Sequence, residues 1–255
     1  MSAINRRNFL TSTAAVGSAT VLTSATSVIG ADAVRGRTNP SGVSGYDYQL
    51  PNIKKGTRLL FQGDSITDMK WGRNQKDRNH YLGHSYVYLI ASRLLTDAPQ
   101  SELEFFNRGM SGHKVSDLLK RWQNDALDMN PDILSILVGV NDSGSVAPEE
   151  YEKGYRSLLE QSRKKNPKLM LVLLKPFVLA SRGETRCKNV AAYGEIVGEL
   201  AKEYKAVLIE TQKIFDDASK DVPESHWIWD GVHPLPQGHE LIARNWIQSV
   251  ADALK

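Results

Sequence analysis

The chain has 255 residues, of which 41% are hydrophobic and 24% are charged, and its formal net charge is +3. This length and balance favour a globular protein with one sizeable core. The basic residues are interspersed with acidic ones and never form a run of five, which argues against nucleic acid as a partner. A single cysteine, Cys187, excludes an intrachain disulfide, and a catalytic role for this lone thiol is not favoured.

Residues 1–33 differ in composition from the rest and are predicted to be an export signal. A twin-arginine pair, Arg6-Arg7, precedes a weakly hydrophobic, uncharged stretch rich in Ala, Ser, Thr and Val. This pattern is similar to signals of the twin-arginine (Tat) route. We therefore expect cleavage after Ala31 or Ala33 and a periplasmic or extracellular protein. A retained leader is the alternative, and a stable membrane-spanning helix is not expected because Leu and Ile are few.

Residues 34–55 are dense in Gly, Pro, Ser and Asn, which indicates a linker or an extended lead-in to a domain spanning residues 56–255. Within that domain, apolar runs alternate with amphipathic stretches at helical spacing. Strands are predicted at residues 58–62, 103–106, 133–138, 169–174 and 206–209. Helices are predicted at residues 82–95, 115–129, 148–165, 211–219 and 237–254, with a further long helix inside 184–204 that starts near Cys187.

Strands that alternate with helices imply parallel pairing and right-handed crossovers. The predicted fold is therefore a single three-layer α/β/α domain with a five-stranded parallel sheet, flavodoxin-like in its organisation. In such a sheet the carboxyl ends of the strands share one edge, which is where ligands bind. The loops that follow the first, second, third and fifth strands should converge there.

Four short polar clusters lie in those loops. Gly-Asp-Ser, with Ser65, ends the first strand, and Asn-x-Gly-x-x-Gly, with Gly109, follows the second. Gly-x-Asn-Asp, with Asn141, follows the third, and Asp-x-x-His runs from Asp230 to His233 in the late loop. Each cluster alone is also a common turn or helix cap. Their joint occurrence, in this order and at these places, favours a catalytic site.

The residue types in these clusters suit acyl transfer. Ser65 is a weak nucleophile unless a base takes its proton, and His233 can be that base. Asp230 can hold the imidazole in the tautomer that this role needs. The backbone N–H groups of Ser65 and Gly109, together with the side-chain amide of Asn141, can stabilise the oxyanion that forms.

Two neighbours of the clusters are candidate substrate contacts. Asp64 precedes the predicted nucleophile and either caps the following turn or touches the substrate, and capping is the favoured interpretation. Trp229 precedes Asp230 and is predicted to form a pocket wall, because indoles stack on sugar rings. Core packing is the alternative for this tryptophan.

Neither a metal nor a cofactor is expected. Three histidines near the first two clusters lack the spacing of metal ligands. They are His80, His84 and His113. No dinucleotide-binding glycine fingerprint follows the first strand.

At these residues the sequence resembles the SGNH (GDSL) hydrolase family, whose name records a serine, a glycine, an asparagine and a histidine. The matching positions are Ser65, Gly109, Asn141 and His233. The resemblance extends from residue 57 to about residue 251. It implies the SGNH hydrolase fold and the hydrolysis of esters through a serine nucleophile.

A narrower resemblance, to the bacterial acetylxylan esterase-like branch, rests on longer stretches around the same clusters. They are residues 61–68, 82–86, 107–112, 117–118, 121–122 and 229–234. This resemblance implies removal of short acyl groups, acetyl above all, from a small-molecule or oligosaccharide ester, and it leaves a homo-oligomer open. Alternatives are a lysophospholipase, thioesterase or arylesterase of the same family. A non-catalytic carbohydrate-binding relative is disfavoured because all the catalytic residue types are present.

Overall fold

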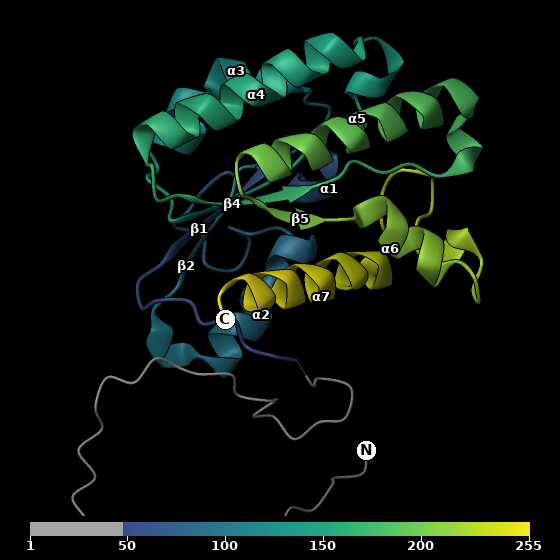
Figure 1. Cartoon of the computed structure of the whole chain (residues 1–255). Coiled ribbons are helices and arrows are strands. Elements are labelled where there is room, and N and C mark those ends of the chain that lie inside the picture. The colour runs from purple at the N-terminus through teal and green to yellow at the C-terminus, as the bar shows by residue number, and fades with distance from the viewer. Residues whose placement is uncertain (1–47) are drawn as a thin grey trace, which may run out of the picture. The chain divides into compact units, whose positions relative to one another are not determined.

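The computed structural model describes residues 48–255 (Figure 1). The predicted export signal at residues 1–33 and most of the predicted linker at residues 34–55 lie outside the described residues. In the part of the linker that is described, Leu50 is only 2% exposed and packs into the core. No helix among the described residues combines the length and apolar character that a membrane span requires.

Five strands form one parallel sheet in the order β2-β1-β3-β4-β5, which is a flavodoxin-like order. The centre of the sheet is β1 paired with β3, from Leu59 beside Ile133 to Gly63 beside Leu137. Because helices cover both faces, β3 is buried along its whole length, and its only polar residue, Ser135, accepts the Trp246 Nε1–H at 2.9 Å. The strands are β1 (Arg58–Gly63), β2 (Glu104–Asn107), β3 (Ile133–Leu137), β4 (Met170–Leu174) and β5 (Val207–Ile209).

Helices lie on both faces of the sheet, as Figure 1 shows, so the predicted three-layer α/β/α fold is confirmed. One face carries α3, α4 and α5, and the other carries α2, α6 and α7. Side chains of β1 alternate between the two cores, with Phe61 on the α2–α7 side and Leu60 on the α3–α5 side. The helices are α1 (Ser65–Asp68), α2 (Tyr86–Asp97), α3 (Val115–Trp122), α4 (Pro148–Lys165), α5 (Glu184–Glu203), α6 (Thr211–Ala218) and α7 (Pro236–Ala253).

Three predicted helices differ from the observed ones at an end. The helix predicted at 82–95 begins only at Tyr86, because the Ser85 hydroxyl caps it by accepting the Val87 N–H at 3.2 Å. The helix predicted at 115–129 is α-helical only to Trp122 and continues as one π-helical turn, Gln123–Leu127. The four-residue helix α1 was not predicted. The long helix predicted to start near Cys187 begins three residues earlier, at Glu184. The remaining predicted elements agree with the structure to within one residue at each end.

Candidate active site

Ser65 is the first residue of α1 and follows β1 across a tight turn. A Cβ atom at Gly63 would lie 2.3 Å from the Leu137 carbonyl oxygen, so only glycine fits at the end of β1. The Asp64 carboxylate accepts the Ile66 N–H at 3.0 Å and is 1% exposed. Asp64 therefore caps α1, as the favoured interpretation expects, and its carboxyl group is directed away from solvent.

Ser65, His233 and Asp230 form a chain of hydrogen bonds. The Ser65 Oγ lies 2.7 Å from His233 Nε2, and His233 Nδ1 lies 2.7 Å from Asp230 Oδ2. Burial raises the pKa of Asp230, but hydrogen bonds from His233 and the Val232 N–H outweigh burial and lower it below its ordinary value. The ionised carboxylate can only accept, so Nδ1 carries the proton and Nε2 is left to accept the serine hydroxyl.

The loop that carries Asp230 and His233 is fastened to the segment after β4. The Leu179 N–H donates to the Gly231 carbonyl oxygen at 2.9 Å, and the Trp229 N–H donates to the His233 carbonyl oxygen at 3.3 Å. The Trp229 side chain itself is 68% exposed. It is therefore not a core residue, and its role as a pocket wall stays a prediction.

Asn141 follows β3 and contacts the loop between β2 and α3. Its amide Nδ2 donates to the His113 carbonyl oxygen at 3.1 Å. The next residue, Asp142, is 1% exposed and accepts the Val115 N–H at the start of α3 at 3.1 Å. Burial raises the pKa of Asp142 to about 6. The Asn141 and Asp142 side chains thus link the segments that follow β2 and β3. These segments lie at the carboxyl edge of the sheet, where Ser65 also lies.

Gly109 is buried, and both polar groups of its backbone have partners. Its N–H donates to Asn107 Oδ1 at 2.9 Å, and its carbonyl oxygen accepts the Trp71 Nε1–H at 2.8 Å. A Cβ atom here would lie 2.4 Å from the Asp68 nitrogen. The structure therefore explains this glycine by close packing against α1, and the N–H predicted to bind an oxyanion is already hydrogen-bonded.

Gly112, the second glycine of the same cluster, differs on each of these points. It is exposed, has a φ of +81°, and has open space where a Cβ would lie. No hydrogen bond between residues 48 and 255 uses its N–H. It directly precedes His113, the residue that Asn141 contacts. The prediction named the first glycine of the Asn-x-Gly-x-x-Gly pattern as an oxyanion donor, although the pattern indicates the second glycine equally well.

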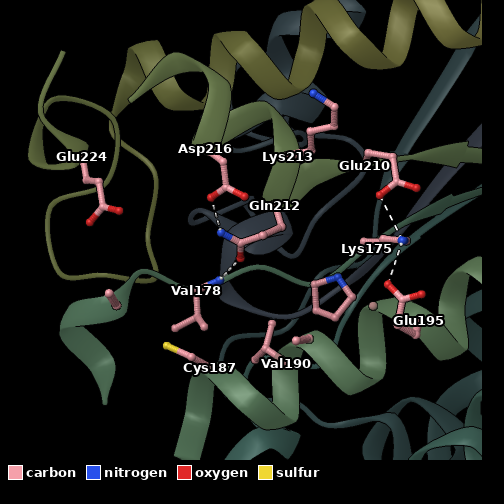
Figure 2. Close-up of a pocket in the computed structure, with 14 residues that line it drawn as sticks. Lys175, Val178, Cys187, Val190, Glu195, Glu210, Gln212, Lys213, Asp216 and Glu224 are labelled. Atoms are coloured by element: carbon pink, nitrogen blue, oxygen red, sulfur yellow. Dashed lines mark hydrogen bonds and ion pairs between the residues drawn. The ribbon is translucent and has the colours of Figure 1, made fainter. Parts of the chain in front are cut away.

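A separate cavity of about 430 Å³ opens at the carboxyl ends of β4 and β5, beside α5 and α6 (Figure 2). Lys175 lies on its wall, with Nζ 3.0 Å from Glu210 and 3.5 Å from Glu195. Gln212 accepts the Val178 N–H at 3.0 Å. These polar groups are thus paired with one another, and none of the predicted catalytic residues lines this cavity.

A flavodoxin-like sheet that presents a serine directly after its first strand is the architecture of SGNH hydrolases, and solved structures of that class match the fold. Residues 61–241 match the model of the GDSL-like lipase/acylhydrolase family. The chain belongs to this family, as its sequence clusters predict.

The chain is 30% identical over 212 residues to an acetylxylan esterase of Geobacillus stearothermophilus, a match that covers 78% of this chain and 95% of that protein. A crystal structure from Parabacteroides merdae, described as a GDSL-like lipase, is 35% identical with a TM-score of 0.75, covering 80% of this chain and 98% of that one. The crystal structure of Axe2, an acetylxylan esterase from Geobacillus stearothermophilus, is 30% identical with a TM-score of 0.71, covering 78% and 95%. The protein is therefore a carboxylic ester hydrolase, and its resemblance to the acetylxylan esterase-like branch is confirmed.

Proposed function

We propose that the protein removes acetyl groups from carbohydrates, with Ser65, His233 and Asp230 as its catalytic triad. The hydrogen-bonded chain of these three side chains, with 2.7 Å at each step, carries the proposal. The relative that is matched over 95% of its length is an acetylxylan esterase, which supports a sugar hydroxyl as the alcohol. Two Axe2 structures, with a serine or an aspartate replaced by alanine, are described as catalytic mutants, and they support the same two residue types here.

In the first half of the reaction, the Ser65 oxygen attacks the ester carbonyl carbon as His233 Nε2 takes the hydroxyl proton. Asp230 remains ionised and stabilises the imidazolium through Nδ1–H. When the tetrahedral intermediate collapses, the bond from carbon to the sugar oxygen breaks. His233 returns the proton to that oxygen, so the sugar alcohol leaves and an acyl-enzyme on Ser65 remains.

In the second half, water takes the place of the sugar. His233 Nε2 removes a proton from the water, and the resulting oxygen attacks the acyl carbon. Collapse of the second intermediate breaks the bond to the Ser65 oxygen, which recovers its proton from His233. Acetate leaves, and the enzyme returns to its starting state.

Both intermediates carry a negative oxygen that needs preorganised donors. We assign this role to the Ser65 N–H, the Asn141 amide and the Gly112 N–H. The Ser65 N–H has no partner within α1, because a helix leaves its first N–H groups unpaired. Gly112 is preferred to Gly109 because its N–H is exposed and unpartnered among the described residues, whereas the Gly109 N–H is held by Asn107.

The described surface favours a short acyl group. Among residues 48–255, the large apolar side chains that are exposed are Tyr88, at 47%, and Trp229, at 68%. A long acyl chain would need a continuous apolar trough to leave water, and two separate side chains do not form one. Trp229, which precedes the triad aspartate, is better suited to stack on a sugar ring. The Tat-type signal predicted for residues 1–33 would place this activity outside the cytoplasm, where polysaccharides are met.

The proposal is tested by acetate release from a panel of acetylated polysaccharides and oligosaccharides, with xylan, glucomannan and pectin included. We expect the wild-type protein to release acetate from at least one of them and the Ser65→Ala variant to release none. In parallel, kcat/KM is measured on p-nitrophenyl esters from acetate to octanoate. It should fall by about tenfold or more along this series, because few large apolar side chains are exposed among the described residues to contact the longer chains.

Octanoate as the better substrate would refute the acetyl assignment and favour the lysophospholipase or thioesterase alternatives. Hydrolysis of p-nitrophenyl acetate without acetate release from any carbohydrate would leave the triad in place and favour an arylesterase.

A further inference from the structure

The loop between β2 and α3 is fastened to the last residue of α1, the helix that begins with Ser65. That last residue, Asp68, is 2% exposed. Its Oδ2 accepts the Ser111 N–H at 2.9 Å and the Ser111 hydroxyl at 2.7 Å. Ser111 directly precedes Gly112, so the Asp68 carboxylate is hydrogen-bonded to the neighbour of the residue whose N–H is assigned to the oxyanion.

Arg73 holds the same carboxylate from a second direction. Its Nη1 lies 2.8 Å from Asp68 Oδ1 and its Nη2 lies 2.7 Å from Oδ2, which makes a bidentate ion pair. Burial raises the pKa of Asp68, but hydrogen bonds from Arg73 and Ser111 outweigh burial and hold the pKa below its ordinary value. The carboxylate is therefore a fixed anion whose orientation is set by Arg73 on one side and by the loop on the other.

The chain between Asp68 and Arg73 adds another contact to the same loop. The Trp71 Nε1–H donates to the Gly109 carbonyl oxygen at 2.8 Å, and the Arg73 guanidinium lies 4.8 Å from the centroid of the Trp71 ring. Left-handed backbone conformations, which cost energy in residues other than glycine, occur three times in this short segment. They are found at Met69, Lys70 and Arg73, with φ of 32°, 63° and 55°.

We propose that Asp68, clamped by Arg73, is a positioning residue that sets the Gly112 N–H relative to the Ser65 hydroxyl. Helix α1 has only four residues, and its turn is closed by the Asp68 N–H on the Asp64 carbonyl at 2.9 Å. Its two ends are thus rigidly related, and a loop tied to Asp68 is also tied to Ser65. This inference rests on the proposed function, because it needs Ser65 as the nucleophile and Gly112 as an oxyanion donor.

A purely structural role for the ion pair makes a different prediction. The Asp68 side chain is only 2% exposed, so removing Arg73 would leave a buried charge without its ion-pair partner, and a structural role would appear as a lower free energy of unfolding. The placement of an oxyanion donor, in contrast, affects the rate strongly, since a displacement of about 1 Å can cost about 10²-fold. Positioning therefore predicts a loss of kcat in a protein that still folds and still binds substrate.

The first test is Asp68→Asn, which keeps the size of the side chain and removes its charge. The new amide keeps one oxygen that accepts, but its NH2 group can only donate, so the side chain cannot accept from both Ser111 and Arg73 as the carboxylate does. For p-nitrophenyl acetate we expect kcat to fall by about 10- to 100-fold and KM to stay within about twofold, because the oxyanion exists only after substrate has bound. The matched control is Glu104→Gln, which removes the Glu104–Arg58 ion pair at the opposite edge of the sheet and should leave kcat unchanged.

The second test is chemical rescue. Arg73→Ala should lower kcat in the same way, and because the site of the side chain is half open to solvent, added methylguanidinium should restore kcat severalfold without changing KM. Ser111→Ala, which removes one of the two bonds to the loop, should lower kcat less than Asp68→Asn does. A role confined to folding would show neither the rescue nor this ranking.

Wild-type kcat in folded Asp68→Asn would overturn the positioning role and leave the proposed function intact. If Asp68→Asn does not fold, kcat within about twofold of wild type in both Arg73→Ala and Ser111→Ala would overturn it instead. A lowered kcat in Arg73→Ala that methylguanidinium does not restore would also count against positioning. Failure of the proposed function is distinguishable, because the wild-type protein would then not hydrolyse p-nitrophenyl acetate through Ser65.

Discussion

The two ends of α1 carry the same residue type in nearly the same burial, yet they differ in charge. Asp64 is 1% exposed and Asp68 is 2% exposed. Burial raises the pKa of Asp64 to about 7, because the Ile66 N–H offsets only part of its effect and Asp142 adds a nearby negative charge. Burial acts on Asp68 in the same direction, but hydrogen bonds from Arg73 and Ser111 reverse the outcome and lower its pKa.

Hydrogen-bond donors, rather than burial, therefore decide whether these two carboxyl groups are protonated or ionised. None of the ion pairs between residues 48 and 255 includes Asp64, whereas Arg73 binds Asp68 in bidentate fashion. At the first end of the helix, a carboxyl group that readily takes a proton lies beneath the nucleophile and caps the turn. At the other end, a fixed anion organises the loop that supplies Gly112.

The largest expected effect belongs to the first residue of α1. Ser65→Ala removes the atom that attacks the ester, so the rate of p-nitrophenyl acetate hydrolysis should fall by about 10⁴-fold or more, far beyond the loss expected for Asp68→Asn. Thermal unfolding should be nearly unchanged, because only one hydroxyl is lost. Ser116→Ala, at an exposed position of α3, is the control and should keep full activity. Activity above about 1% of wild type in Ser65→Ala would mean that α1 does not carry the nucleophile.

The two glycines of the loop offer a second separation, measured by urea unfolding. A Cβ atom in Gly109→Ala would lie 2.4 Å from the Asp68 nitrogen and 2.8 Å from the Thr67 carbonyl carbon, and backbone atoms cannot move aside cheaply. We expect the free energy of unfolding to fall by about 3 kcal/mol. Gly112→Ala meets open space and should cost only about 1 kcal/mol, for its φ of +81°. The reverse ranking would contradict the packing role assigned to Gly109.

Much of the architecture followed from the residue pattern, because the physics that sets it is local or topological. The run at 133–138, apolar except for Ser135, could be recognised as a buried central strand, since a strand covered on both faces lacks regular polar alternation. Ser65, Asn141 and His233 could be predicted to meet because parallel strands share one carboxyl edge. The structure brings Ser65 and His233 to 2.7 Å although they are 168 positions apart in the chain.

The features that the sequence pattern could not predict depend mainly on how side chains from distant parts of the chain meet in the fold. Gly109 and Gly112 are equivalent as letters in a motif, and only the folded structure distinguishes them: Gly109 is packed against α1 with its N–H bonded to Asn107, whereas Gly112 is exposed. Asp68 and Ser111 are 43 positions apart, and neither residue type signals its partner. Helix α1 itself escaped prediction because four residues are too few to show a helical period.

The smallest expected effect concerns the pH dependence of stability, and it probes the comparison at α1 directly. Asp64 in the folded protein has a pKa of about 7, above its ordinary value of 3.8, so between these values the folded state holds a proton that the unfolded chain has released. The stability from this proton is complete below about pH 4 and is lost as pH rises through 7.

Asp64→Asn retains an oxygen to cap Ile66 and does not titrate. Its melting temperature relative to wild type should therefore rise by about 5 °C between pH 5 and pH 8, because over this range only wild type loses the stability that comes from the proton. Asp217→Asn is the control, because lysines on the surface lower the pKa of Asp217 to about 2 and it does not titrate between pH 5 and 8. An Asp64→Asn difference that is the same at both pH values would mean that Asp64 ionises as Asp68 does, and that the two ends of the helix are electrostatically alike.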